Sequence, residues 1–192
     1  MSAIDKAKSL ATRLGALVAA PVEFRGEVTL RLLEPERIAE VCTIARNEFG
    51  YNMLIDLCSI DNYGESPRWT LVYELYCMAE KAHLRLKTEV SEEASELPTV
   101  SGVWPTADWH EREAYDMMGI RFRGHPDLRR ILMWDGYPYH PLRKDFPLAG
   151  KPTELPEVAF TKPAPLEGGP FVTVAGGKDA GAREPRVRNP ET

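Results

Sequence analysis

Side chains that can bind protons or metals are concentrated in the stretch WHEREAYDMMG, residues 109–119. Six of its eleven residues carry such groups. The stretch begins like the H-E-x-x-H zinc motif, in which two histidines one helical turn apart bind the metal and the glutamate is the base. Ala114 occupies the second histidine position, and His83, His125 and His140 show no ligand spacing between them. We therefore predict no metal site in this stretch.

The same stretch offers Glu111, Glu113 and Asp116 as paired carboxylates for acid–base hydrolysis. On a helix, Glu113 and Asp116 share a face that points away from Glu111, so no pair faces across a substrate cleft. The chain also has no nucleophile elbow, no phosphate-binding glycine loop and no dinucleotide fingerprint. A structural charge network is therefore favoured, and an independent hydrolase is kept as the alternative of a different class.

The pattern predicts that this stretch forms a helix. Asp108 is expected to cap its start, with Glu111 at the third position as in a capping box. Gly119 is expected to end it. At 100° per residue, Arg112 and Asp116 fall on the side opposite the apolar residues, so the sequence predicts an apolar side that faces the core and a charged side that faces away from it.

Glu111 is the exception, because it projects from the apolar side beside Tyr115 and Met118. A carboxylate in such a place must be bonded to backbone amides, paired with an arginine, or held neutral. Arg129 and Arg130 follow shortly downstream as candidate partners. We predict that Glu111 ties the helix to the segment that follows it.

Helix and strand patterns alternate along the chain before this stretch. Helices are predicted near the N-terminus, from Ile4 to Leu17, and behind Pro35, with Gly50 as the stop. Alternating or apolar runs predict strands over residues 22–33, 51–60, 68–78 and 83–90, of which the last two form a hairpin. The fold class is therefore predicted as α+β, a mostly antiparallel sheet with helices packed on it, followed by a long extended Pro-rich C-terminal arm.

The composition changes after Ile120, since the last 72 residues hold 11 of the 16 prolines and 8 of the 14 glycines. Regular helix and sheet are disfavoured there. Up to about Gly150 the chain still carries aromatic and leucine side chains that it cannot bury against itself, which favours docking on another protein. We predict an α+β domain over 1–120 that includes the charged helix, an extended partner-docking arm over 121–150, and a Pro/Gly-rich tail over 151–192.

Charge, hydropathy and cysteine content exclude several classes of function. A net charge of -5 argues against a general nucleic-acid binder. No apolar run approaches the roughly 20 residues that cross a bilayer, and the N-terminus lacks a signal-peptide pattern, so we expect a cytoplasmic chain without direct membrane insertion. Cys42, Cys58 and Cys77 are scattered and odd in number, so we expect buried apolar thiols rather than zinc, iron–sulfur or disulfide chemistry.

From Glu111 onward, EREAYDMMGIRFRGHPDLRRIL resembles the signature of the C subunit (NuoC) family of the proton-pumping NADH–quinone oxidoreductase, respiratory complex I. The resemblance covers roughly residues 20–150 and includes YNMLIDLCSIDNYG and LVYELYC, which are similar to the family's core strands. The signature positions are Glu111, Arg112, Glu113, Asp116, Met117, Met118, His125, Arg129, Ile131 and Leu132. HPLRKDFPL is similar to the family's extended arm, through Pro141, Leu142, Arg143, Lys144, Asp145, Phe146 and Pro147.

The resemblance implies a non-catalytic structural subunit in the peripheral arm of a translocase that couples NADH oxidation to quinone reduction. It implies a peripheral protein on the cytoplasmic side of the bacterial inner membrane. The large hydrogenase-like D subunit is the main expected partner, with the B and I subunits nearby. No cofactor is expected in this chain, since FMN, the iron–sulfur clusters, NADH and quinone belong to other subunits. The alternative is the equivalent subunit of a related hydrogenase or ferredoxin–quinone complex.

The resemblance also implies roles for single residues. The expected charge network that fixes the helix and the start of the arm consists of Glu111, Arg112, Glu113, Asp116, His125 and Arg129. Within it, Arg129 is expected to take one of the carboxylates, because its planar fork suits bidentate pairing, and His125 is expected to be a loop residue satisfied by backbone. The expected docking residues are Trp134, Pro141, Leu142, Arg143, Lys144, Asp145 and Phe146. Trp104, Trp109 and Trp134 are expected to be packing anchors.

Overall fold

The computed structural model describes residues 2–147. The chain divides into two compact units, Met1–Lys144 and Asp145–Thr192, and every helix and strand described below lies in the first. In chain order the elements are α1 (Ala3–Leu14), η1 (Gly15–Leu17), β1 (Val22–Phe24), β2 (Glu27–Leu32), η2 (Pro35–Arg37), α2 (Ile38–Asn47), β3 (Met53–Asp61), β4 (Trp69–Cys77), β5 (Ala82–Val90), β6 (Glu96–Pro98), α3 (Ala107–Met118) and β7 (Arg121–Arg123).

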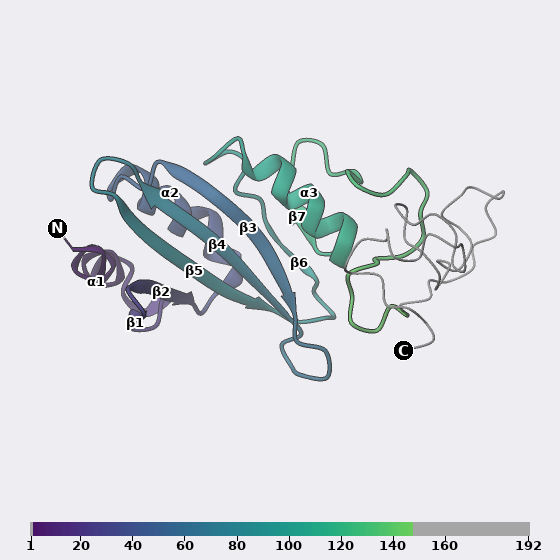
Figure 1. The fold of residues 1–192 in the computed structure, drawn as a ribbon, viewed down its shortest axis with the longest axis horizontal. Helices are drawn as coiled ribbons and strands as arrows, with labels where there is room; N and C mark the ends of the chain where they lie inside the picture. The colour runs from purple at the N-terminus through teal and green to yellow at the C-terminus, as the bar shows by residue number, and fades with distance from the viewer. Residues whose placement is uncertain (1, 148–192) are drawn as a thin grey trace, which may run out of the picture. The chain divides into compact units, whose positions relative to one another are not determined.

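The main sheet has five strands in the order β1-β2-β5-β4-β3 (Figure 1). Every pairing is antiparallel except that between β2 and β5. The predicted hairpin of residues 68–78 and 83–90 is confirmed as β4 and β5, with Tyr73 opposite Leu86. The predicted α+β class with a mostly antiparallel sheet is therefore confirmed.

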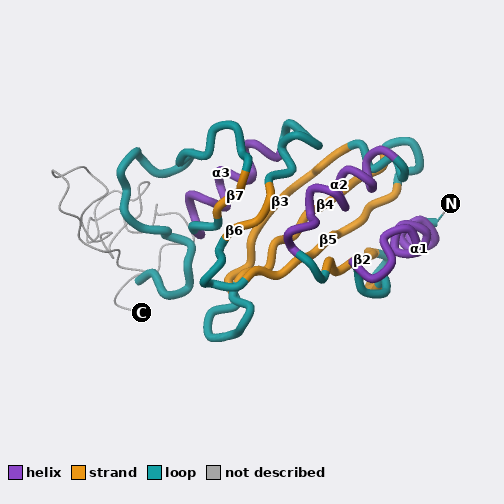
Figure 2. Tube along the Cα trace, turned by 180° about the vertical axis from the view of Figure 1, so that it is seen from behind, coloured by secondary structure: helices purple, strands orange, loops and turns teal. Residues whose placement is uncertain are grey.

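One face of the sheet is buried, because side chains alternate between the two faces along each strand. On β4 and β5, the inward positions Leu71, Tyr73, Leu75, Leu84 and Leu86 are at most 1% exposed. Helix α2 lies across this face in Figure 2 and behind the sheet in Figure 1. Some of the intervening positions of the same strands carry charged side chains, such as Glu74 and Arg85, which pair across the two strands.

The region predicted as one strand over residues 22–33 is a tight hairpin of β1 and β2 instead. Arg25 and Gly26 form its two-residue turn, with φ angles of 53° and 81°, and positive φ at both central positions is what this kind of turn requires. The single-strand prediction was wrong because the alternation hides the turn. Val22 and Phe24 are 63% and 67% exposed, whereas Val28 is buried.

The chain beyond Ile120 begins with structure that belongs to the same compact unit. Strand β7 pairs in parallel with β6, and Ile120 and Phe122 are at most 2% exposed in the core. The boundary expected after Ile120 therefore does not coincide with the division between units, which follows Lys144. Residues 148–192, which include the predicted tail, lie outside the described part of the chain.

The three cysteines have different surroundings. Cys42 and Cys77 are buried as predicted, but Cys58 is exposed. The prediction was wrong for Cys58 because this residue pairs with Val72 in the sheet and lies on the face that α2 does not cover. Among the described residues, no helix combines the length and the apolar character that a membrane span needs.

Candidate functional site

Helix α3 carries the signature carboxylates and ends as the sequence predicts. Gly119 adopts the left-handed conformation, with φ of 80°, and its N–H donates to the carbonyl of Tyr115 at 2.9 Å. The start differs from the prediction, because Thr106 is the N-cap residue and Asp108 lies in the first turn. The predicted capping box is wrong, since the Glu111 carboxylate is used elsewhere.

Asp116 has no exposed surface, although the helical pattern places it on the polar side. Its carboxylate accepts a charged hydrogen bond from Arg130 at 2.5 Å and backbone N–H bonds from Ile131, Leu132 and Met133 at 2.8–3.1 Å. Burial alone would raise the pKa of Asp116, but these donors outweigh burial and lower it. Asp116 is therefore held as a carboxylate that fixes residues 130–133 to the helix.

Glu111 is equally inaccessible but has a different environment. Its carboxyl group accepts the N–H of Val100 at 2.7 Å and lies 2.5 Å from the Thr99 hydroxyl oxygen. Burial raises the pKa of Glu111 to about 7, and Asp108 adds to that rise, while the two hydrogen bonds oppose it. Glu111 thus ties α3 to the loop that precedes the helix, so the prediction that it binds Arg129 or Arg130 and ties the helix to the following segment was wrong.

Arg130, rather than Arg129, is the arginine that pairs with a signature carboxylate. The Arg129 side chain is 66% exposed and pairs with Asp127, which is 55% exposed. Arg112, only 9% exposed, donates to the carbonyls of Arg129 and Arg130, each at 3.2 Å. Of the predicted network, Asp116 and Arg112 hold the start of the following segment, Asp116 with Arg130 in place of Arg129 and Arg112 through backbone carbonyls rather than a carboxylate.

His125 and Glu113 complete the predicted network set. The His125 side chain is fully buried, with Nδ1 accepting the Asp127 N–H at 3.0 Å and Nε2 lying 3.2 Å from the Asp108 carbonyl. These bonds to backbone groups agree with the prediction for His125. Because Nδ1 accepts a hydrogen bond, the ring proton is on Nε2. Nε2 also lies 3.8 Å from the Glu111 carboxyl. Glu113 is exposed and lines a hollow of about 180 Å³ between α3 and β3, which Asp56 of β3 also lines.

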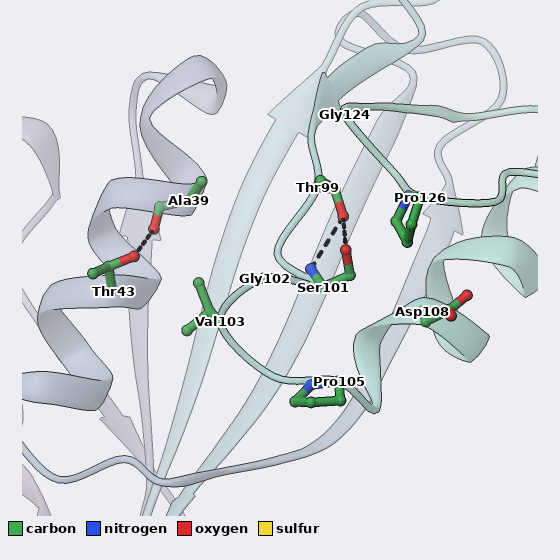
Figure 3. A pocket seen from close by; sticks show the side chains of 10 residues that line it. All are labelled: Ala39, Thr43, Thr99, Ser101, Gly102, Val103, Pro105, Asp108, Gly124 and Pro126. Atoms are coloured by element: carbon green, nitrogen blue, oxygen red, sulfur yellow. Dashed lines mark hydrogen bonds between the residues drawn. The ribbon is translucent and has the colours of Figure 1, made fainter.

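A larger open hollow of about 660 Å³ lies beside the Glu111 environment (Figure 3). Helix α2, the loop between β6 and α3, the first turn of α3 and the loop after β7 all contribute to it; the residues are Ala39, Thr43, Thr99, Ser101, Gly102, Val103, Pro105, Asp108, Gly124 and Pro126. Thr99 and Ser101 are hydrogen-bonded to each other at its wall. Within the described residues, no group of three or more His, Cys, Asp or Glu is arranged to hold a metal ion.

Residues 129–144, here called the strap, cover the C-terminal end of α3. A helix leaves its last carbonyls without partners inside the helix, and the strap supplies donors for three of them. The carbonyl of Asp116 accepts from Arg130 at 3.1 Å and His140 at 2.9 Å, that of Met117 from the N–H of Leu142 at 3.2 Å, and that of Met118 from Arg143 at 2.7 Å. Cationic side chains also suit the negative end of the helix dipole, so the strap works as an extended helix cap.

Gly119 allows this close approach. A Cβ atom at this position would meet the guanidinium of Arg143 and would lie 2.7 Å from Nε2 of His140. Together with its positive φ, this contact explains why the helix ends in glycine.

The strap is anchored at its far end on the sheet. The N–H of Lys144 donates to the carboxylate of Asp61 at 2.8 Å. Asp61 is 3% exposed and also accepts hydrogen bonds from Nε and Nη2 of Arg68, at 2.9 and 3.0 Å. The guanidinium of Arg143 lies over the Trp69 ring, 5.2 Å from its centre. The strap therefore runs from the end of α3 to the β3–β4 turn.

Several residues expected to dock on a partner thus make contacts within the chain. Arg143 and the backbone of Lys144 are used as described above, and Trp134 packs on Tyr137 with ring centres 4.6 Å apart. Pro141 is partly buried and Leu142 is 58% exposed, whereas Asp145 and Phe146 belong to the second unit. The exposed apolar side chains that the strap offers to solvent are Leu132 and Leu142.

Trp104 and Trp109 were both predicted to be packing anchors, but only Trp104 is buried. Trp104 is buried and donates its indole N–H to the Tyr51 carbonyl at 3.2 Å, as expected of an anchor. Trp109 is 61% exposed and is stacked by Arg112 at 5.4 Å. The anchor prediction was wrong for Trp109 because the residue lies on the helix side that the sheet does not cover.

The residues that sequence reasoning missed are Thr99, Val100, His140, Asp61 and Arg68. Thr99 and Val100 bond to Glu111, His140 bonds to the carbonyl of Asp116, and Asp61, paired with Arg68, accepts the N–H of Lys144. No helix or strand periodicity pointed to these pairings. His140 had one usable signal, since it begins the HPLRKDFPL run.

Comparison with known proteins gives consistent results. The family model described as "Respiratory-chain NADH dehydrogenase, 30 Kd subunit" matches residues 32–152. The C subunit of the NADH-quinone oxidoreductase of Geotalea uraniireducens is 49% identical over 132 residues, which are 69% of this chain and 80% of that protein. The C subunit of the same enzyme from Geobacter metallireducens is 48% identical over 129 residues, 67% of this chain and 79% of that protein.

Solved structures show the same fold. A trypsin-resistant fragment of Nqo5 superposes with a TM-score of 0.57 at 29% identity, covering 66% of this chain and 99% of that fragment. A chain of the membrane-bound sulfane sulfur reductase, an archaeal respiratory membrane complex, superposes with a TM-score of 0.66 at 21% identity, covering 75% of this chain and 85% of that one. At that identity the second likeness concerns the fold alone.

The raised pKa of Glu111 predicts a specific pH dependence of stability. The folded-state pKa of about 7 lies above the ordinary 4.5, so stability from the neutral carboxyl is fully present below about pH 4.5 and is lost as the pH rises to about 7. Glu111→Gln removes the titration. The free energy of unfolding of the wild type, minus that of the variant, should fall by on the order of 3 kcal/mol between about pH 4.5 and pH 8.

Urea denaturation at several pH values measures this difference, and Glu113→Gln is the matched control at an exposed position of the same helix. The control should show no such fall. A difference between wild type and Glu111→Gln that is constant over the range would show that Glu111 is ionised throughout.

The buried Asp116–Arg130 pair predicts a large stability loss on Asp116→Asn. The change leaves the arginine, 13% exposed, without its counter-charge, so we expect a loss of about 3–5 kcal/mol. Asp127→Asn, at the exposed pair with Arg129, should cost at most about 1 kcal/mol. Thermal or urea unfolding measures both variants, and equal losses would mean that Asp116 is no more important than a surface charge.

Proposed function

Since this chain belongs to the family of the 30 kDa subunit of respiratory-chain NADH dehydrogenase, we propose that it is the non-catalytic C subunit of a proton-translocating NADH–quinone oxidoreductase. Its role in this proposal is to give shape and ionic contacts to the peripheral arm of the enzyme. The observation that carries the proposal is the internal use of the signature residues, which hold α3 and the strap together.

The geometry of the carboxylates supports a structural role over acid–base catalysis. Glu111 is bonded to the loop before α3, and Asp116 to the strap after it. The two groups therefore face different segments, and the third, Glu113, is exposed away from both. Hydrolytic catalysis needs two carboxyl groups that face one substrate, and no two of these three signature carboxylates line the same hollow. We expect the purified chain alone to show no turnover.

In this proposal FMN, the iron–sulfur clusters, NADH and quinone are bound by other subunits, and this chain binds none of them. The three cysteines lie on α2, β3 and β4 and do not form a ligand cluster among the described residues. The chain is proposed to sit as a peripheral protein on the cytoplasmic side of the inner membrane. In this proposal the chain does not bind the electron donor, so its sequence does not identify the donor. The alternative is therefore the equivalent subunit of a related membrane-bound complex. The subunits that co-purify with the chain would decide between the two.

The proposed partners are the large hydrogenase-like D subunit as the main contact and the B and I subunits nearby. The strap offers a rigid surface for such a contact, because hydrogen bonds to α3 and to Asp61 fix its backbone. Leu132 and Leu142 stand out from it, 62% and 58% exposed. Apolar side chains on a preordered backbone lose little entropy when a partner covers them, which makes these two leucines the proposed contact points.

The test is co-purification of the D subunit with a tagged chain that carries Leu132→Asp and Leu142→Asp. Both positions are exposed, so the free energy of unfolding should change by no more than about 0.5 kcal/mol. Recovery of the D subunit should nevertheless fall at least about tenfold, as expected when interface anchors are removed.

Met78→Asp is the matched control, because Met78 is 61% exposed and follows the opposite end of β4 from the strap anchor. It should leave recovery of the D subunit unchanged. Normal recovery with the double leucine variant would contradict the proposed contact, and identification of the other co-purified subunits decides between the NADH-linked complex and its alternative.

A further inference from the structure

A lysine and a cysteine that are far apart in sequence meet inside the fold. Lys6 of α1 and Cys77 at the end of β4 are 4% and 2% exposed. The ammonium nitrogen of Lys6 donates to the sulfur of Cys77 at 3.1 Å and to the carboxylate of Glu80 at 2.6 Å. Glu80 is 40% exposed, so the cluster has a protein side and a solvent side.

A tyrosine closes the protein side of this cluster. The Lys6 nitrogen lies over the ring of Tyr51, 5.3 Å from its centre. Tyr51 has no exposed surface, and its hydroxyl group has no hydrogen-bond partner among the described residues. A buried hydroxyl without a partner is costly, and here it belongs to the ring that borders the lysine–cysteine contact.

Burial of the lysine is not required by its ion pair. A lysine commonly extends its charge into water while its stem stays on apolar surface, and Glu80 is accessible enough for such a pair. Instead, the ammonium group of Lys6 lies against the thiol of Cys77. Packing alone does not require a thiol at this position, because an apolar side chain of similar size would fill the same space. This placement gives the nitrogen and sulfur atoms a fixed separation and an orientation toward each other, which are the conditions for a reaction between them.

We propose that Lys6 and Cys77 form an oxidation site, at which dioxygen links the lysine nitrogen to the cysteine sulfur through one bridging oxygen atom. One amine, one thiol and one dioxygen give one N–O–S bridge and one water. An N–O and an O–S bond form, while one N–H bond, the S–H bond and the O–O bond break. The nitrogen and the sulfur lose two electrons each and the two oxygen atoms gain two each, so the oxygen atom that does not enter the bridge leaves as water with the two hydrogens.

Glu80 accepts the proton that the Lys6 ammonium must lose before it reacts. Burial lowers the pKa of Lys6, but the hydrogen bonds to Glu80 and Cys77 outweigh burial and raise it, so the nitrogen begins as an ammonium. An ammonium has no free electron pair, and it becomes reactive only after it gives up a proton. The carboxylate at 2.6 Å accepts that proton and, being accessible, passes it to solvent.

The separation of the two atoms favours the oxygen bridge over a direct S–N bond. One oxygen atom bonded to both would hold nitrogen and sulfur slightly closer than the observed 3.1 Å, so the fold needs little movement. A direct bond would need a much closer approach. Dioxygen is small and uncharged, and the first turns of α1 are a place where helix ends open readily, so the oxidant can reach the contact.

The bridge would fasten α1 to the sheet covalently. It closes a loop between residues separated by 71 positions, and a link of that kind restricts the unfolded chain, as a disulfide does. Because the S–O bond is cleaved by thiols, a reductant restores the open form. The site would thus make the stability of the fold depend on oxidation.

The experiment uses the full chain with Cys58→Ser, which removes the exposed thiol. One sample is kept in air, and a second is kept under anaerobic conditions with dithiothreitol. After proteolysis, mass spectrometry should find in the first sample a peptide pair that contains Lys6 and Cys77 with the summed mass plus one oxygen minus two hydrogens. Dithiothreitol should remove this species, and the aerobic sample should show the higher melting temperature.

Three controls make the result specific. Lys6→Arg keeps the positive charge but should abolish both the linked species and the rise in melting temperature. Glu80→Gln should slow the formation of the link severalfold. Cys42 is as buried as Cys77 and should react with an alkylating reagent after denaturation in every sample.

The proposal is overturned if Cys77 of the aerobic sample is a free thiol or sulfinic acid with Lys6 unlinked. It is equally overturned if the linked mass lacks the oxygen atom, or if the same species forms in Lys6→Arg. None of these outcomes depends on the contact with the D subunit, so the test is independent of the proposed function.

Discussion

The buried carboxylate of Asp116 is the interaction on which the arrangement of α3 and the strap depends. Four donors converge on it, one from the Arg130 guanidinium and three from consecutive backbone amides. Such a set compensates the cost of burying a charge, which a single ion pair inside a protein rarely does. The turn of chain at residues 130–133 is thereby fixed, and the rest of the strap can follow it to the sheet.

The strap also explains why Arg112 and Asp116, on the polar side of α3, are buried. The sheet covers one side of the helix and the strap covers the C-terminal end of the other, so Arg112 and Asp116 have protein on both sides. Each is used for backbone groups of the strap, which has no regular secondary structure to pair them. A segment without regular secondary structure is ordered in this way by a helix that precedes it, rather than by its own hydrogen bonds.

Glu111 and Asp116 show how two carboxyl groups on one helix take opposite protonation behaviour. Neither has exposed surface. Asp116 has an arginine and three amides, so its pKa falls; Glu111 has one amide and one hydroxyl, so burial prevails and its pKa rises to about 7. The number and charge of the donors decide the outcome, and the sequence shows neither.

The parts of this structure that follow from local pattern were predictable, and the parts that follow from distant contacts were not. Period-two alternation and turn residues predicted the β4–β5 hairpin, and glycine after the last helical residue predicted the end of α3. The same alternation concealed the turn at Arg25 and Gly26, because the apolar positions keep their spacing through it. The choice of Arg130 over Arg129 depends on how the strap turns, and that turn is set by tertiary contacts with Asp116.

The central claim is that the strap is ordered by the chain itself before any partner binds. Hydrogen exchange of the amides of Ile131, Leu132 and Met133 in the isolated, purified chain tests this claim most directly. The structure predicts strong protection at all three amides, since each donates to the buried Asp116 carboxylate. Exchange at the rate of an unstructured peptide would contradict it and would mean that only a partner protein orders the strap.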